Sequence, residues 1–142
     1  DTAVISFDGT DKLNGLGAPE FDVVEANPAA TNTLAASDYG NLLATVFGSV
    51  TYANFSTTGV YIDITLDANG RANVEKGAGA ITKYGTRLNW DTDNSFGGAW
   101  SSGASSYFTA GFADTAGTGD DPKLVVTYTP VGVAAGSYSY FM

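Results

Sequence analysis

The sequence contains no cysteine and no histidine among its 142 residues. Zinc and copper sites are built mainly from thiolates and imidazoles, so metal sites of that kind are excluded. Ser-His-Asp and Cys-His catalytic machinery needs the same two residue types and is excluded with them. Without cysteine there can be no disulfide bond, so the sequence gives no redox indication of a cellular compartment.

Charged side chains are scarce, and most of them are acidic. They make up 15% of the chain, whereas about a quarter is usual in soluble domains. The 6 basic residues are spread singly between Lys12 and Lys123 against 15 acidic ones, for a net charge of −9. A phosphate backbone is bound by clustered basic side chains, so we expect neither nucleic acid nor a membrane surface as a partner.

Long apolar runs are also missing, and none approaches the roughly 20 residues that span a bilayer. Apolar residues nevertheless make up 44% of the chain and aromatic residues 13%, which is enough for one packed domain. With few charges, the surface must be covered by Thr, Ser, Asn, Gly and Ala, as is common where proteins meet other proteins or sugars outside the cell. Because the chain opens on Asp1 rather than Met, we expect a processed product or a fragment.

Short apolar runs alternate with turn-forming residues along most of the chain, which is typical of all-β proteins. The alternation is clearest at 59–66, where Ile62 and Ile64 share a face and Asp63 lies on the other. Strands are predicted at 2–7, 21–25, 46–52, 59–66, 80–90, 107–112 and 124–129, the first of them ending at Asp8-Gly9. We therefore predict an all-β fold, an antiparallel jelly-roll-like β-sandwich with one or two short helices, near 37–43 and 67–75.

The same alternation predicts which side chains are buried. Residues expected to be mostly buried are Val4, Ile5 or Phe7, Val23, Ile62, Ile64, Leu66, Ile81, Leu88, Phe108, Phe112, Leu124 and Val126. Arg87 is expected on the opposite face of its strand from Thr86 and Leu88, where it would pair with an acidic residue across the sheet.

The chain divides into a β-sandwich domain at 1–130 and an apolar, aromatic tail at 131–142. Seven strands leave one position open in a jelly roll, which commonly has about eight, and an open sheet edge is a template for another strand. We expect the tail, from about Val133 onward, to pack on a neighbouring subunit, possibly as an added strand. The alternative is that it folds back on its own subunit. The expected interface residues are Tyr138, Tyr140, Phe141 and Met142.

Four motifs occur in order between residues 37 and 129: S-D-Y-G at 37–40, Y-I-D-I-T-L-D-A at 61–68, T-K-Y-G-T-R at 82–87 and D-P-K-L-V-V-T-Y at 121–128. This arrangement resembles a β-sandwich module of bacteriophage structural proteins, which is similar to the DNRLRE-type domain of secreted bacterial proteins. The resemblance implies a jelly-roll-like domain in a virion or cell-surface protein, often in a tail or decoration role. It implies no catalytic residues.

Two groups of side chains are candidates for ligand binding. Trp90, Trp100 and Tyr107 flank one loop and would suit a sugar-binding platform, although bulky residues at strand ends more often cap the core. Asp91 and Asp93 are weak Ca²⁺ candidates, because the oxygen-rich loop lacks the full ligand pattern and turn formation explains it equally well.

The sequence therefore favours a non-enzymatic structural subunit of a virion or extracellular assembly, such as a capsid decoration or cement, tail or filament component, acting through self-association. Its expected partners are copies of itself and other virion or surface proteins. The alternative is a carbohydrate- or receptor-binding adhesion module, with glycans as partners. No cofactor and no catalysis are expected, and the expected location is the virion surface or the extracellular space.

Overall fold

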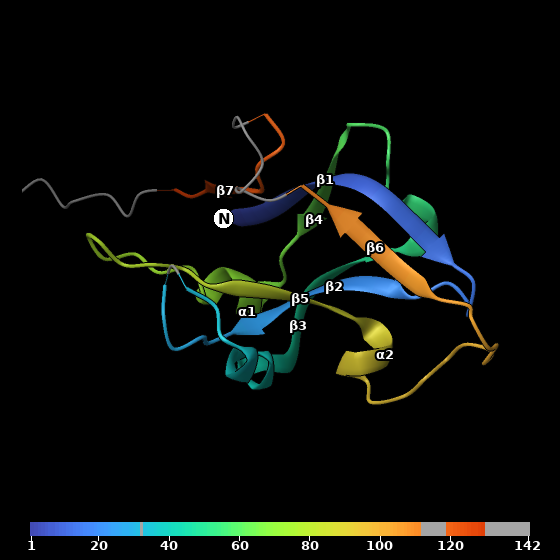
Figure 1. Ribbon diagram of the computed structural model, residues 1–142. Helices are drawn as coiled ribbons and strands as arrows, with labels where there is room; N and C mark the ends of the chain where they lie inside the picture. Colours follow the sequence, from blue (N-terminus) through green and yellow to red (C-terminus); the bar gives the residue numbers. More distant parts are fainter. Residues whose placement is uncertain (32, 112–118, 130–142) are drawn as a thin grey trace, which may run out of the picture.

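The computed structural model describes residues 1–31, 33–111 and 119–129 (Figure 1). Its strands are β1 (Thr2–Asn14), β2 (Glu20–Ala26), β3 (Leu42–Thr51), β4 (Tyr61–Thr65), β5 (Tyr84–Leu88), β6 (Ser106–Ala110) and β7 (Lys123–Thr127). Its short helical segments are η1 (Ala36–Asn41), η2 (Tyr52–Asn54), α1 (Ala68–Ala72) and α2 (Asn89–Thr92). The predicted all-β class is confirmed, with four short helical segments where one or two were expected, and each predicted strand has a counterpart. None of the helices in the described ranges is long and apolar enough to cross a membrane.

The strands form two antiparallel sheets that stack as a sandwich, as predicted (Figure 1). In the four-stranded sheet, β1 is central: β4 pairs with it, β7 pairs with its first half at Thr2–Ser6, and β6 pairs with its second half at Gly9–Asn14. The three-stranded sheet has the order β3-β2-β5. The helix α2 lies against the side of this sheet that faces away from the four-stranded sheet (Figure 1).

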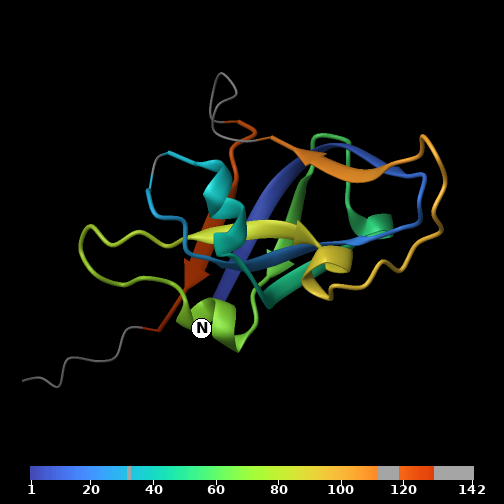
Figure 2. The same cartoon turned by 60° about the horizontal axis from the view of Figure 1, so that its bottom comes forward.

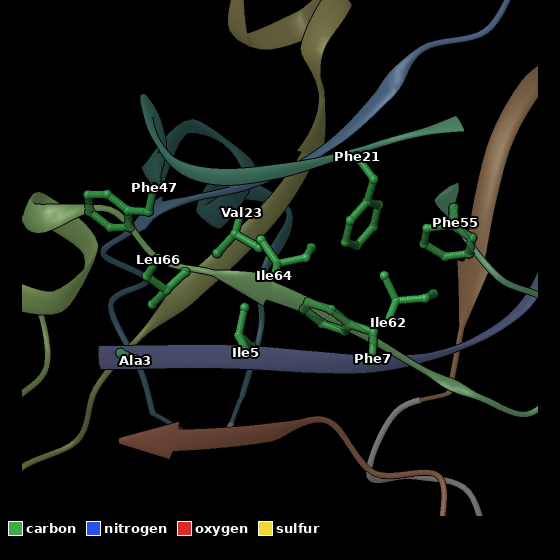
Figure 3. Packing of buried hydrophobic residues seen from close by; sticks show 10 residues of the cluster. All are labelled: Ala3, Ile5, Phe7, Phe21, Val23, Phe47, Phe55, Ile62, Ile64 and Leu66. Carbon is green, nitrogen blue, oxygen red and sulfur yellow. The ribbon is translucent and has the colours of Figure 1, made fainter. Parts of the chain in front are cut away.

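The hydrophobic core lies between the two sheets (Figure 3). It consists of Ala3, Ile5, Phe7, Phe21, Val23, Phe47, Phe55, Ile62, Ile64 and Leu66. The rings of Phe7 and Phe21 join the sheets edge to face, with centroids 5.3 Å apart. The predicted burial is confirmed for Ile5, Phe7, Val23, Ile62, Ile64 and Leu66. Phe21, Phe47 and Phe55 were not on the predicted list.

The prediction was wrong for three other residues. Ile81 is 54% exposed because β5 begins only at Tyr84, so the predicted strand at 80–90 is shorter than expected. Leu124 and Val126 are 38% and 40% exposed. Both pair with core residues of β1 and so face the interior, but the sandwich is open between β7 and β5, and Leu124 lines the groove there. Val4, Leu88 and Phe108 are half-buried, and Phe112 lies outside the described residues.

The local predictions at turns had mixed outcomes. The short helices expected near 37–43 and 67–75 are present as η1 and α1, the latter begun by Asp67, whose side chain accepts a hydrogen bond from the Gly70 N–H at 2.7 Å. The first strand does not end at Asp8-Gly9 but continues to Asn14, with a register shift at Gly9. Asp91 and Thr92, predicted to lie in a loop, belong to α2.

Candidate functional site

The sandwich is open along one side, between β5 and β7. A groove of about 630 Å³ lies there, with Ile5, Phe7 and Leu124 on one wall and Tyr84 and Thr86 on the other. We refer to it as the lateral groove. Apolar side chains from the chain segments beside β5, including Leu34 and Leu42, extend its floor. Asp38 is the one charged side chain among the described residues that line it.

The groove exists because both strands that border it lack a neighbour. Among the described residues, β5 pairs with β2 alone and β7 with β1 alone. The backbone edge of β5 is therefore free of a partner strand, and Leu124 on the interior face of β7 borders the groove. Unpaired edges and uncovered apolar side chains are features that proteins usually protect, so this side of the molecule is the leading candidate for an interface.

A second hollow, of about 390 Å³, lies near the Leu88 end of β5. We refer to it as the aromatic hollow. Its rim brings together Tyr39 of η1, Arg87 of β5, and Trp90 and Asp91 of α2. Trp90 also packs edge to face against Phe96, with ring centroids 4.8 Å apart. Aromatic rings beside charged and hydroxyl groups are a suitable lining for a polar ligand.

Asp91 is the centre of the polar contacts in this hollow. Its Oδ2 accepts hydrogen bonds from Arg87 Nε and from the Tyr39 hydroxyl, both at 2.6 Å. The Arg87 guanidinium also donates to the Leu42 carbonyl at 2.9 Å and lies 5.7 Å from the centroid of the Tyr39 ring. The prediction that Arg87 pairs across the sheet was wrong, because its partner lies four residues further along the chain.

These contacts shift the titration of the groups involved. Hydrogen bonds from Arg87 and Tyr39 hold the pKa of Asp91 below its usual value, and the hydrogen bond to Asp91 raises the pKa of Tyr39. The pKa of Asp38, in the lateral groove, is lowered for a different reason. Its carboxylate accepts hydrogen bonds from the backbone N–H groups of Ala35 and Ala29, at 2.9 and 3.3 Å.

Replacing Arg87 with glutamine is expected to raise the pKa of Asp91 towards its usual value. The hydrogen bond from Arg87 is the largest cause of the lowered pKa, and a neutral glutamine would weaken it. Since the folded-state pKa is depressed, this contact stabilises the fold above about pH 4 and ceases to do so as the pH falls through the folded-state pKa. Titration of the carboxyl carbons by NMR measures the shift. Asp38 is the internal control, because Arg87 contributes nothing to its low pKa; equal shifts at both residues would contradict the assignment.

The structure separates the three aromatic residues that the sequence placed around one loop. Trp90 is half-buried and lines the aromatic hollow. Trp100 is 80% exposed and is not among the residues that line it. Tyr107 is 37% exposed on β6, where its hydroxyl donates to Asp11 Oδ2 at 2.8 Å. The hollow instead uses Tyr39, which sequence reasoning missed because nothing local connects it with Asp91, 52 residues away.

The calcium candidates and the tail residues have different outcomes. Asp91 is engaged by Arg87 and Tyr39, and in the described ranges no three or more acidic side chains lie together as a metal site would need. Asp93 follows α2 and is exposed. The expected interface residues Tyr138, Tyr140, Phe141 and Met142 lie outside the described residues.

Two carboxylate oxygens are buried without a hydrogen-bond partner, one from Asp8 and one from Asp121. The register pairs Ser6 with Lys123, so continuing the same antiparallel alignment sets Asp8 opposite Asp121. Lys123 places its ammonium 3.4 Å from the centroid of the Tyr61 ring, and Tyr61 is paired with Asp8 in the sheet. The two buried oxygens therefore belong to residues beside the place where β4 and the start of β7 meet β1.

Comparisons of the chain with protein-family models, with curated proteins and with solved structures found no match. The function of this protein is therefore inferred from its sequence patterns and from the geometry of the lateral groove and the aromatic hollow. Of the two sites, the lateral groove has the larger volume. It also lies beside the unpaired backbone edge of β5, whereas the aromatic hollow is described by its side chains.

Proposed function

We propose that this protein is a non-enzymatic structural subunit of a virion or extracellular assembly, a capsid decoration, tail or filament component, and that it acts through self-association. The observation that carries the proposal is the open side of the sandwich. There, β5 has no second neighbour among the described residues, and the inward-facing Leu124 and Val126 are 38% and 40% exposed. An assembly interface would bury both features.

The charge distribution supports the same proposal. At a net charge of −9, two copies repel each other over most of their surfaces. The lateral groove is lined by apolar and uncharged polar residues apart from Asp38, so it is a region where two copies can meet at little electrostatic cost. The virion and extracellular setting rests on the sequence resemblance and on the weakly charged, polar composition.

Self-association is tested by measuring the molar mass of the full chain in solution. Sedimentation equilibrium at physiological salt, over a wide range of concentrations, is expected to give dimers or larger multiples of the subunit mass. Raising the salt concentration should leave the association intact or strengthen it, because the contact is apolar and the repulsion between acidic surfaces is screened. A strictly monomeric protein at every concentration would rule the proposal out.

A second candidate function is a carbohydrate- or receptor-binding adhesion module. The aromatic hollow favours it, because Trp90 and Tyr39 lie there beside Arg87 and Asp91. Glycan-array binding by a monomeric form, lost on Trp90→Ala and retained on Trp100→Ala, would support this candidate. Trp100 is the matched control because it is an exposed tryptophan that does not line the hollow.

A further inference from the structure

The lateral groove has the features of a missing strand position. We propose that residues 133–142 of a second copy add as a strand along β5 and fill the lateral groove. This inference rests on the proposed function and names the segment and the edge that would join two copies. The added strand would pair with the edge of β5 that has no partner strand among the described residues.

Both sides of the groove have groups that an added strand would pair with or cover. The free edge of β5 offers backbone N–H and C=O groups, which a partner strand would pair. On the facing wall, Leu124 and Val126 pair with Ile5 and Ala3 and point into the sandwich, where nothing in the described part of the chain covers them. β5 is five residues long, so at about 3.3 Å per residue a strand of five or six residues would cover it.

The segment that follows β7 has the composition that this position needs. Residues 130–142 contain no charged side chain, in a chain that otherwise carries 21 charged residues, 6 basic and 15 acidic. In a strand, Tyr138, Tyr140 and Met142 would share one face, and Ser139 and Phe141 the other. Tyrosine and phenylalanine are also among the residues favoured in strands. An uncharged strand with bulky apolar and aromatic side chains matches a groove whose described lining has a single carboxylate, that of Asp38.

The direction of the strands indicates that the segment comes from a second copy. β7 runs antiparallel to β1 and ends beside the N terminus, with Thr127 paired to Thr2 (Figure 2). Across the core, Phe21 lies over Phe7 and Val23 lies towards the Ala3 end, so β2 runs opposite to β1 (Figure 3). Since β5 is antiparallel to β2, it begins with Tyr84 at the end of the sandwich where β7 finishes.

A chain that left β7 and entered its own groove directly would therefore run parallel to β5. Every pairing between the named strands is antiparallel. To pair in the same way, the segment must enter at the Leu88 end of β5, which its own chain reaches only by first crossing the length of the strand. A segment from a second copy has no such constraint, and exchange between copies then links folding to assembly.

The test uses cysteine pairs, which are unambiguous because the chain has no cysteine. One copy carries Thr86→Cys, on the β5 wall of the groove, and the other carries Tyr140→Cys, on the face of the segment that would point into the groove. We expect the mixed copies to form a disulfide-linked heterodimer under mild oxidation. The matched control is Ser49→Cys, because Ser49 is exposed on β3 and paired with Asp22 on the outer face of the sheet; it should give no crosslink with Tyr140→Cys.

Deletion of residues 133–142 provides an independent measurement and is expected to convert the oligomer to a monomer. Oligomers that persist after the deletion, or that form without the Thr86–Tyr140 crosslink, would overturn this inference and leave self-association standing. A crosslink that forms within a single doubly substituted chain, and not between mixed copies, would overturn the exchange between copies. A full chain that is monomeric would overturn the proposed function as well. Thermal unfolding of each variant shows whether the parent fold is kept.

Discussion

Replacing Ile64 with alanine is expected to lower the free energy of unfolding by about 2–5 kcal/mol. Ile64 is 2% exposed in the middle of β4, and its partner in the sheet is Ile5. Its packing is close, since a Cβ added at Gly48 of the opposite sheet would lie 2.8 Å from the Ile64 Cγ2. The neighbouring backbone is therefore fixed around this side chain, and truncation would leave a cavity that the core cannot readily close. Unfolding in urea measures the loss.

The matched control for this substitution is Ile81→Ala. The side chain removed is the same, but Ile81 is 54% exposed and precedes β5. Surface substitutions of this kind usually change stability by less than about 0.5 kcal/mol. A loss well under about 1 kcal/mol at Ile64, or similar losses at both positions, would show that the core has been assigned to the wrong face of β4.

The contrast between these two isoleucines shows what the sequence can predict. The alternation at 59–66 correctly predicted buried Ile62, Ile64 and Leu66, because it reports which side chains share one face of a strand. Leu124 and Val126 also face the interior, yet they stay partly exposed. Their exposure depends on the open groove between β7 and β5, which no local pattern contains.

The same limit applies to the candidate site. The sequence identified Trp90 as part of an aromatic platform and Asp91 as a weak calcium candidate. The sequence suggested a calcium role for Asp91, whereas in the structure its carboxylate binds Arg87 and Tyr39. Tyr39 reaches it from η1 only because η1 and α2 each lie next to the three-stranded sheet. Contacts between distant segments depend on how the elements pack, so they could not be predicted from spacing.

Gly9 is a residue whose role the sequence suggested wrongly. Asp8-Gly9 is a common turn signal and was interpreted as the end of the first strand. In the structure β1 continues through Gly9, and the register shifts between Gly9 and Asp11 as β1 passes from β7 to β6. A glycine inside a strand often marks an irregularity of this kind or a close approach of another chain segment. Both apply here, because the segment after η2 packs directly against this position.

Replacing Gly9 with alanine is therefore expected to destabilise the fold by at least about 1–3 kcal/mol. The added Cβ would overlap the carbonyl oxygen of Ser56 and would lie 2.6 Å from the Phe55 ring and 2.8 Å from Ile62. A backbone oxygen cannot rotate away as a side chain can, so either β1 or the segment after η2 must move. That movement would also disturb Phe55, which is 1% exposed in the core.

The control for this substitution is Gly40→Ala, since an added Cβ at Gly40 has no atom within 4 Å and Gly40 is not among the glycines with positive φ. Gly40→Ala is expected to leave stability unchanged or to raise it by about 0.4–1 kcal/mol, because alanine restricts the unfolded chain. Urea unfolding of the two variants beside the parent measures both effects. If Gly9→Ala changed the free energy of unfolding no more than Gly40→Ala, the segment after η2 would not pack on β1 at this point. The register shift between Gly9 and Asp11 would then need another cause.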